Sequence, residues 1–294
     1  MNVLVTGANG QLGNSIRALS GGSAHRFIFS DICGREGVET VLLDITDREA
    51  VRLVSKSENV DVIVNCAAYT DVDAAESDEY PADLLNRVAP SNLASVAEEL
   101  GCALIHISTD YVFGNVDPIP VTPETPAAPC SVYGRTKLAG EKAVAGSGCS
   151  YLIIRTAWLY SEYGKNFVKT MLALTASNSS LKVVCDQVGS PTYAGDLAAA
   201  ILRILDCWDR SSSAVYHFTG EGAVSWYDFA WEINSLSGHS CRIVPCLSDE
   251  FPSKVARPHY SVLDKSSIKA AFGVEIPYWK ESLVRCLSAI GEIE

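Results

Sequence analysis

The sequence lacks any cluster of basic side chains. Its 294 residues include 23 Lys and Arg against 35 Asp and Glu, which gives a net charge of -12 at pH 7. Because contacts to nucleic-acid phosphates require clustered cations, this charge argues against DNA or RNA as a partner. No apolar run approaches the roughly 20 residues that a membrane helix needs. The first ten residues, MNVLVTGANG, contain no signal-type segment, so we expect a cytoplasmic protein with no membrane attachment.

The sequence also lacks the spacings typical of disulfide frameworks and metal sites. Ten cysteines are scattered without a C-x-x-C pair, and the five histidines show no metal-ligand spacing. Many of the cysteines fall inside apolar segments, where a reduced thiol packs as a small hydrophobic side chain. We therefore expect free thiols and no bound metal. The chain is 48% hydrophobic, which is enough to bury a full core.

Short apolar runs alternate with helical patterns through the first half of the chain. Such alternation is typical of βαβ units and predicts an α/β fold, a doubly wound parallel sheet with helices on both faces. The predicted strands are residues 2–6, 26–31, 60–67, 103–108 and 151–155. After residue 156 the pattern is looser. It predicts strands at 181–185 and 215–218, helices at 194–205, 225–236 and 279–290, and proline-bearing pocket walls or lids at 116–129 and 247–258.

Two of the predicted helices carry specific signals. Thr46 and Glu49 form a T-x-x-E box, which predicts a helix start at that point. A long helix over residues 84–100 contains Pro90, which lacks an N–H group, so we expect a kink near it.

The stretch TGANGQLG predicts a dinucleotide-binding loop. Gly7, Gly10 and Gly13 lie between the first strand and the first helix, where a tight turn and a close-lying pyrophosphate both exclude a Cβ. The amides at the helix start, around Gln11 and Leu12, then point at the anion. Glycines at such a position often serve only to form a turn, but the strand before them and the helix after them favour a cofactor site.

The second predicted strand ends at Asp31. A carboxylate there can accept hydrogen bonds from the adenosine ribose hydroxyls and repels a 2′-phosphate, which favours NADH. Arg35 lies four residues further on and can pair with a phosphate, so NADPH stays open. Asp31 could also simply cap a loop.

Further cofactor contacts are expected where later strands end. Asp44 and Ile45 follow an apolar run and are predicted to flank the adenine. Ala67, Ala68 and Tyr69 follow the strand at 60–67, where small residues let a cofactor pass close to the sheet edge. In open α/β sheets, ligands bind outside the carboxyl ends of the strands.

Tyr133 and Lys137, in SVYGRTKLAG, are four residues apart and share one face of a helix. Most such pairs are surface features, but this one follows a strand ending in HISTD and a dinucleotide loop. A phenol with a pKa of about 10 is a poor proton donor at neutral pH, and a neighbouring ammonium lowers that pKa. Thr109, or Ser108 beside it, offers a hydroxyl that can hold a substrate oxygen near Tyr133.

Eight motifs occur in one order along nearly the whole chain. They are TGANGQLG, NCAAYTDVDAAE, HISTDYVFG, VYGRTKLAGE, RTAWLY, FVKTML, DQVGSPTYAGDLA and ARPHYSVLD. Together they resemble the extended short-chain dehydrogenase/reductases, and among these the dTDP-4-dehydrorhamnose reductase family. The resemblance implies a Rossmann domain in residues 1–155, to which segments near 186–215 return. It implies a smaller α/β substrate-binding domain in most of 156–294.

The resemblance also implies an oxidoreductase that uses NADPH or NADH. The expected reaction reduces the 4-keto group of dTDP-4-dehydro-6-deoxy-L-mannose (dTDP-4-dehydro-β-L-rhamnose) to dTDP-L-rhamnose, the last step of dTDP-rhamnose biosynthesis. In it Tyr133 protonates the developing alkoxide, Lys137 binds the nicotinamide ribose and tunes Tyr133, and Thr109 hydrogen-bonds the carbonyl oxygen.

Substrate residues follow from the same resemblance. They are Ser108, Thr109, Asp110, Tyr111, Trp158 and Arg257. Tyr111 and Trp158 match positions that line the sugar pocket, where an aromatic wall suits a deoxysugar methyl, although both also suit a plain core. Arg257 is expected to bind the diphosphate because a guanidinium can donate two parallel hydrogen bonds to a phosphate. A surface arginine is the alternative.

The chain departs from the family at two positions. Some members are dimers bridged by magnesium through glutamates, and this chain has Ser15 and Gly195 where those glutamates are expected. Without carboxylates a hard divalent cation has few ligands. We therefore expect a monomer or weak homodimer with no magnesium bridge.

Three other functions are alternatives to this reductase. Related dehydratases carry an Asp-Glu pair after the threonine, whereas here Tyr111 follows Thr109 and Asp110, which argues against elimination. Another nucleotide-sugar reductase or epimerase stays open. So does a non-catalytic subunit, because the regulatory β subunit of methionine adenosyltransferase resembles these reductases.

Overall fold

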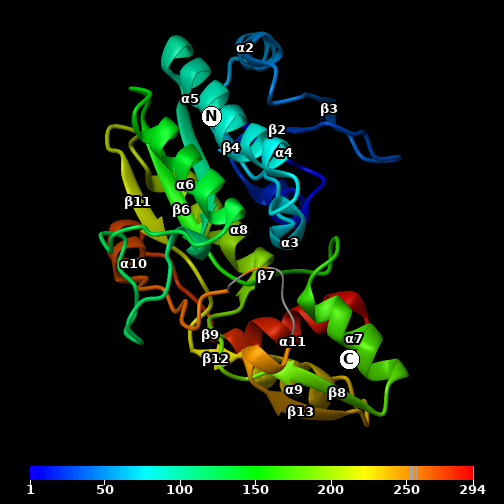
Figure 1. The fold of residues 1–294 in the computed structure, drawn as a ribbon. Coiled ribbons are helices and arrows are strands. Elements are labelled where there is room, and N and C mark those ends of the chain that lie inside the picture. Colours follow the sequence, from blue (N-terminus) through cyan, green and yellow to red (C-terminus); the bar gives the residue numbers. More distant parts are fainter. Residues whose placement is uncertain (252–254, 256, 294) are drawn as a thin grey trace.

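A seven-stranded parallel sheet forms the centre of the larger of two lobes (Figure 1). The computed structural model describes residues 1–251, 255 and 257–293. The strands, in spatial order, are β11 (Ala214–His217), β6 (Tyr151–Thr156), β5 (Ala103–Thr109), β4 (Val62–Asn65), β1 (Asn2–Thr6), β2 (Arg26–Asp31) and β3 (Val41–Leu42). The chain winds outward from β1 in both directions, so the predicted doubly wound sheet is confirmed. A crevice forms beside β1 at the carboxyl ends of the strands, where such folds bind ligands.

Helices cover both faces of this sheet because each presents one apolar side to it. One face carries α1 (Gln11–Leu19), α8 (Ala194–Cys207) and α10 (Ser266–Phe272). The other face carries α2 (Arg48–Ser57), α5 (Ala89–Leu100) and α6 (Val132–Ala145). The strands are buried from both sides, which explains their continuous apolar sequences.

A second hydrophobic core lies in the smaller lobe, below the sheet in Figure 1. Its elements are β7 (Leu159–Tyr160), α7 (Phe167–Ser177), β8 (Ser180–Val184), β9 (Val188–Gly189), β10 (Thr192–Tyr193), β12 (Val224–Ser225), α9 (Trp226–Leu236), β13 (Arg242–Cys246) and α11 (Trp279–Ile290). Both α8 and β11 pack in the larger lobe although they follow residue 156 in the chain. The domain boundary near residue 155 stays a prediction.

The long helix expected over 84–100 is irregular before Pro90. It follows α3 (Val72–Ala75) and consists of α4 (Glu79–Asp83), a π-helical turn η2 (Leu84–Val88) and α5. Because Pro90 has no N–H, it cannot bond to the carbonyl of Asn86, and the helix widens there. Gly140 of α6 lies against that carbonyl: a Cβ at Gly140 would be 2.0 Å from Asn86 O.

One predicted helix start is wrong. The N-cap of α2 is Asp47, whose Oδ1 accepts from the amides of Glu49 and Ala50 at 3.0 Å each. Thr46 instead donates both its hydroxyl and its amide to Asp44 Oδ1, in the turn before the helix.

The sequence patterns also missed α7, β13 and α10. Although β13 contains Pro245, within the described residues it pairs only with β8, and an edge strand tolerates proline. The ten cysteines, all within the described residues, are free. In the same part of the chain, no helix has the length and apolarity needed to span a membrane.

Candidate active site

The glycine loop after β1 forms a cradle that side chains would fill. Gly7 has φ +65°, and a Cβ there would lie 2.6 Å from the amide nitrogen of Ala67. A Cβ at Gly13 would lie 2.5 Å from Gly7 O. Gly10 is the N-cap of α1 and offers no side-chain cap, so the first-turn amides, from Gln11 onward, are available to an anion. This geometry fits a dinucleotide pyrophosphate.

Asp31 and Arg35 both lie against this loop. The Oδ2 atom of Asp31 accepts a hydrogen bond from the amide of Asn9 at 2.9 Å, which fixes the carboxylate beside the loop. Arg35 Nη1 donates to Asn14 Oδ1 at 3.3 Å. The Asp31 carboxylate and the Arg35 guanidinium are therefore both held by residues of the glycine loop and of α1, so neither NADH nor NADPH is favoured by position alone.

The other predicted cofactor residues differ in their placement. Ala67 lies against Gly7, and the amide of Tyr69 donates to Asn86 Oδ1 at 3.0 Å, so the segment after β4 borders the crevice. Ile45 is 6% exposed, with its side chain in the core. Asp44 Oδ1 is occupied by Thr46. Ile45 can thus meet an adenine only with its backbone atoms, whereas the exposed Asp44 keeps its Oδ2 atom for such a contact.

Tyr133 and Lys137 are both buried on α6, at 9% and 2% exposure. The helix begins at Ser131, whose Oγ accepts from the amide of Gly134 at 3.0 Å and so fixes the turn that carries Tyr133. Lys137 Nζ donates to the carbonyl of Ile107 on β5 at 2.7 Å. The two residues therefore do not form a surface pair.

Burial dominates the pKa values of this pair. It raises the pKa of Tyr133 to about 12, against a hydrogen bond with Thr109 that acts in the opposite direction. It lowers the pKa of Lys137 to about 8. The loss of water around the phenol, and not the Lys137 ammonium, sets the direction of the Tyr133 shift, so the expected lowering of the Tyr133 pKa is wrong. Tyr133 keeps its proton at neutral pH and is available as a donor.

Ser108, Thr109 and Asp110 end β5 beside this phenol. Thr109 Oγ1 donates to Asp110 Oδ1 at 3.0 Å and accepts from the amide of Tyr111 at 3.2 Å. Burial raises the pKa of Asp110 to about 6, although hydrogen bonds from Thr109 and Ser261 lower it. Ser108 Oγ is buried and has no hydrogen-bond partner among the described residues.

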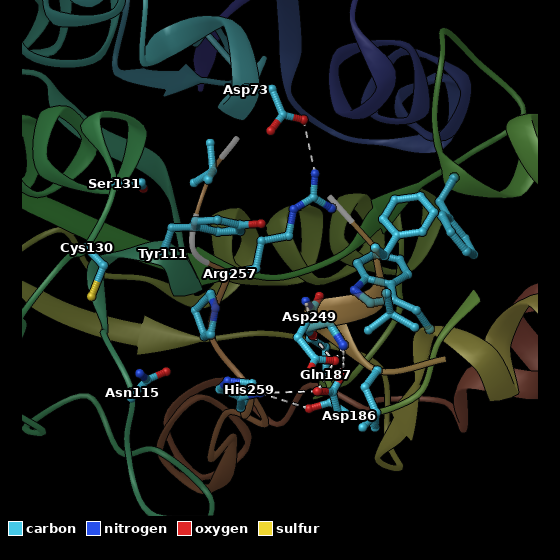
Figure 2. A pocket seen from close by; sticks show the side chains of 18 of the residues that line it. Asp73, Tyr111, Asn115, Cys130, Ser131, Asp186, Gln187, Asp249, Arg257 and His259 are labelled. Carbon is cyan, nitrogen blue, oxygen red and sulfur yellow. Dashed lines mark hydrogen bonds and ion pairs between the residues drawn. The ribbon is translucent and has the colours of Figure 1, made fainter. Parts of the chain in front are cut away.

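A cavity of about 1380 Å³ opens next to this group, between the two lobes (Figure 2). Of the predicted substrate residues, Tyr111 and Arg257 line it. The ring of Tyr111 packs edge-on against Tyr133 with centroids 5.5 Å apart, so the cavity lies one ring away from the buried phenol. Trp158, which has φ +51°, does not line the cavity. It stacks on Trp226, which does, with centroids 3.4 Å apart.

Several cavity residues were not predicted as site residues. They include Asp73, Phe167, Met171, Lys182, Asp186, Gln187, Ser248 and Asp249. Five of them stand in motifs that signalled the family, namely Asp73 in YTDVDAAE, Phe167 and Met171 in FVKTML, and Asp186 and Gln187 in DQVGSP. The expected pocket wall at 247–258 contributes Leu247, Phe251, Val255 and Arg257 among others. Its residues 252–254 and 256 lie outside the described part of the chain.

The doubly wound sheet, the glycine cradle and the buried Tyr133–Lys137 pair together define a short-chain dehydrogenase/reductase of the extended type. The model of the family described as "RmlD substrate binding domain" matches residues 1–291. The chain belongs to this family, in which curated relatives are named dTDP-4-dehydrorhamnose reductase.

Three relatives illustrate the similarity. The dTDP-4-dehydrorhamnose reductase of Sinorhizobium fredii is 38% identical over 99% of this chain and 98% of its own length. The crystal structure of a dTDP-4-dehydrorhamnose reductase from Clostridium acetobutylicum has a TM-score of 0.92 and 40% identity, and covers 99% of this chain and 100% of its own. The enzyme from Bacillus anthracis, solved in complex with NADP, has a TM-score of 0.88, 34% identity and coverage of 98% and 99%.

Proposed function

We propose that this protein reduces the 4-keto group of dTDP-4-dehydro-6-deoxy-L-mannose (dTDP-4-dehydro-β-L-rhamnose) to dTDP-L-rhamnose, with NADPH or NADH, in dTDP-rhamnose biosynthesis. Membership of the family and the relatives' names support the reaction. The observation that carries it in this chain is the buried, protonated phenol of Tyr133, which bonds to Thr109 and packs against the wall of a cavity.

The glycine cradle would hold the dinucleotide through the first-turn amides of α1, with Asp31 and Arg35 at the adenosine ribose. A bound NADPH or NADH supplies the hydride that reaches the sugar C4. Lys137, whose ammonium is anchored on Ile107 O, is placed to bind the nicotinamide ribose hydroxyls. These assignments rest on motif position and on the geometry of the crevice.

Tyr133 would act as the acid. Its Oη–H bond breaks as the carbonyl oxygen gains electron density, and the proton completes the new hydroxyl group. A phenol with a pKa of about 12 still protonates an alkoxide, which is far more basic. Thr109 would hold the carbonyl oxygen near Tyr133 once its hydroxyl, which donates to Asp110 Oδ1 at 3.0 Å, turns to donate to the substrate.

Arg257 would bind the diphosphate. Its guanidinium borders the cavity, and its Nε is buried without a hydrogen-bond partner among the described residues, so it can still donate to a phosphate oxygen. Trp158 would act through Trp226, which presents an aromatic face to the cavity. The cytoplasmic location and a monomer or weak homodimer without a magnesium bridge stay predictions.

An assay of cofactor oxidation tests the proposal. The ketosugar nucleotide, generated enzymatically, is added to the protein with NADPH or with NADH, and absorbance of the reduced cofactor is followed. We expect oxidation and formation of dTDP-L-rhamnose. If the protein bound the cofactor but oxidised none with this or any other ketosugar nucleotide, a non-catalytic subunit would be the better description.

A further inference from the structure

The glycine loop is hydrogen-bonded to the smaller lobe through a single side-chain oxygen. Gln11 Oε1 accepts from Ser161 Oγ and from Asn166 Nδ2, at 3.0 Å in each case. Ser161 and Asn166 bound the loop between β7 and α7, which Figure 1 shows in green, rising from α7 towards the larger lobe. A Cβ at Gly164, inside this loop, would be 3.4 Å from Gln11 Cγ. The loop therefore lies directly on Gln11.

The two donors are themselves fixed. Asn166 is the N-cap of α7: its Oδ1 accepts from the amide of Lys169 at 3.1 Å, while its Nδ2 also donates to Ser161 O at 2.7 Å. Ser161 is fully buried, and its Oγ accepts from the amide of Tyr163 at 3.1 Å. A displacement of Gln11 cannot be absorbed by rotation of one free side chain, because each partner is held by other bonds.

The helix that begins at Asn166 lines the substrate cavity. Phe167 and Met171 of α7 both form part of its wall. Gln11 is the first residue of α1, next to the amides that are expected to bind the pyrophosphate. One short path of hydrogen bonds thus joins the cofactor loop to a wall of the sugar-nucleotide pocket.

We propose that Gln11, Ser161 and Asn166 form a clip between the lobes, through which dinucleotide binding at the glycine loop tightens nucleotide binding in the cavity. The inference rests on the proposed function for the identity of the two ligands. The cofactor orders the loop that contains Gln11, and the clip holds α7 in the position that closes the wall around the substrate nucleotide. Ser161 and Asn166 do not line the cavity and act as positioning residues.

The clip is tested by measurements of ligand binding rather than of turnover. The dissociation constant of dTDP is measured by calorimetry without NADP⁺ and with saturating NADP⁺, and the ratio of the two is the coupling factor. For the wild-type protein we expect at least about fivefold tighter dTDP binding when NADP⁺ is present, the lower end of typical coupling between sites. By linkage, dTDP tightens NADP⁺ binding by the same factor.

The decisive variant is Asn166→Ser. Serine keeps a side-chain oxygen that can cap α7, but its short side chain lacks the amide that donates to Gln11 Oε1. We expect the coupling factor to fall below about twofold, outside the usual range for coupled sites, with little change in the melting temperature. The matched control is Thr170→Ala. Thr170 Oγ1 bonds to Asn166 O within the same helix and does not bond to Gln11, so the coupling should persist.

Ser161→Ala removes one of the two bonds and should give an intermediate coupling factor, which keeps the test available if Asn166→Ser does not fold. Adding Gln11→Leu to Asn166→Ser should lower the coupling no further, because both changes break the same contact. Wild-type coupling that survives in Asn166→Ser would overturn the clip, as would dTDP binding with no coupling at all. Failure of dTDP to bind the wild-type protein would instead refute the substrate class and the clip together.

Discussion

Arg257 Nη2 donates to Asp73 Oδ2 at 3.1 Å, across the mouth of the cavity (Figure 2). Asp73 comes from α3 of the larger lobe, and Arg257 from the loop after β13, so the ion pair joins the two lobes. Asp73 Oδ1 and Arg257 Nε are both buried without a hydrogen-bond partner among the residues described. The pair thus orients the guanidinium and leaves further donors, Nε among them, for a ligand.

This arrangement predicts a defect in substrate binding when Arg257 is replaced by Gln. The variant loses a charge-assisted contact to the diphosphate, which corresponds to an increase in KM of about tenfold to a hundredfold. We expect kcat to change much less, because Arg257 is remote from the transferred hydride. Steady-state kinetics check this. Asp73→Asn keeps the cation and should raise KM less, and a loss confined to kcat in Arg257→Gln would contradict the assignment.

Asp110 predicts a pH dependence of stability. Burial raises its pKa to about 6 in the folded protein, from an unfolded value of about 4. Between these values the folded state binds more protons than the unfolded state, so the free energy of unfolding falls as pH rises through this window. Asp110→Asn should remove this fall. The free energy of unfolding of the variant, minus that of wild type, should therefore increase by up to about 3 kcal/mol from pH 4 to pH 7. Urea unfolding across this range gives the comparison, and parallel curves for the two proteins would count against a buried, neutral Asp110.

Lys137 predicts a pH dependence of activity. Its pKa is lowered to about 8, so the ammonium is present below that pH and is lost above it. If the ammonium binds the nicotinamide ribose, kcat/KM should fall as pH rises through about 8, because this parameter reports groups of the free enzyme. Lys137→Met should be much less active and should lack this fall. A wild-type profile flat from pH 7 to pH 9.5 would show that the charge of Lys137 does not matter.

Local signals explain why the larger lobe could be predicted well from the sequence. The strands at 2–6 and 26–31 have the bounds predicted for them, because apolar β-branched runs there end abruptly at Gly7 and at the turn after Asp31. Tyr133 and Lys137 were predicted because their spacing places them on one helical face and because they follow a dinucleotide loop and a strand ending in HISTD; the structure buries both.

The rest of the site depends on distant segments that no local pattern pairs. Asp73 and Arg257 meet only because the two lobes face each other, and Gln11 meets Asn166 for the same reason. The direction of the Tyr133 pKa shift could not be predicted either. It depends on burial of the phenol, which the packing of Tyr111 and α6 creates.

The central claim is that the buried phenol of Tyr133 gives its proton to the sugar carbonyl oxygen. Tyr133→Phe removes that proton and leaves the ring packed against Tyr111. Single-turnover oxidation of bound NADPH by the ketosugar nucleotide measures the step directly. We predict a rate at least about a hundredfold lower than wild type, the usual contribution of a general acid, with NADP⁺ affinity unchanged. A variant that oxidised NADPH at the wild-type rate would contradict the account.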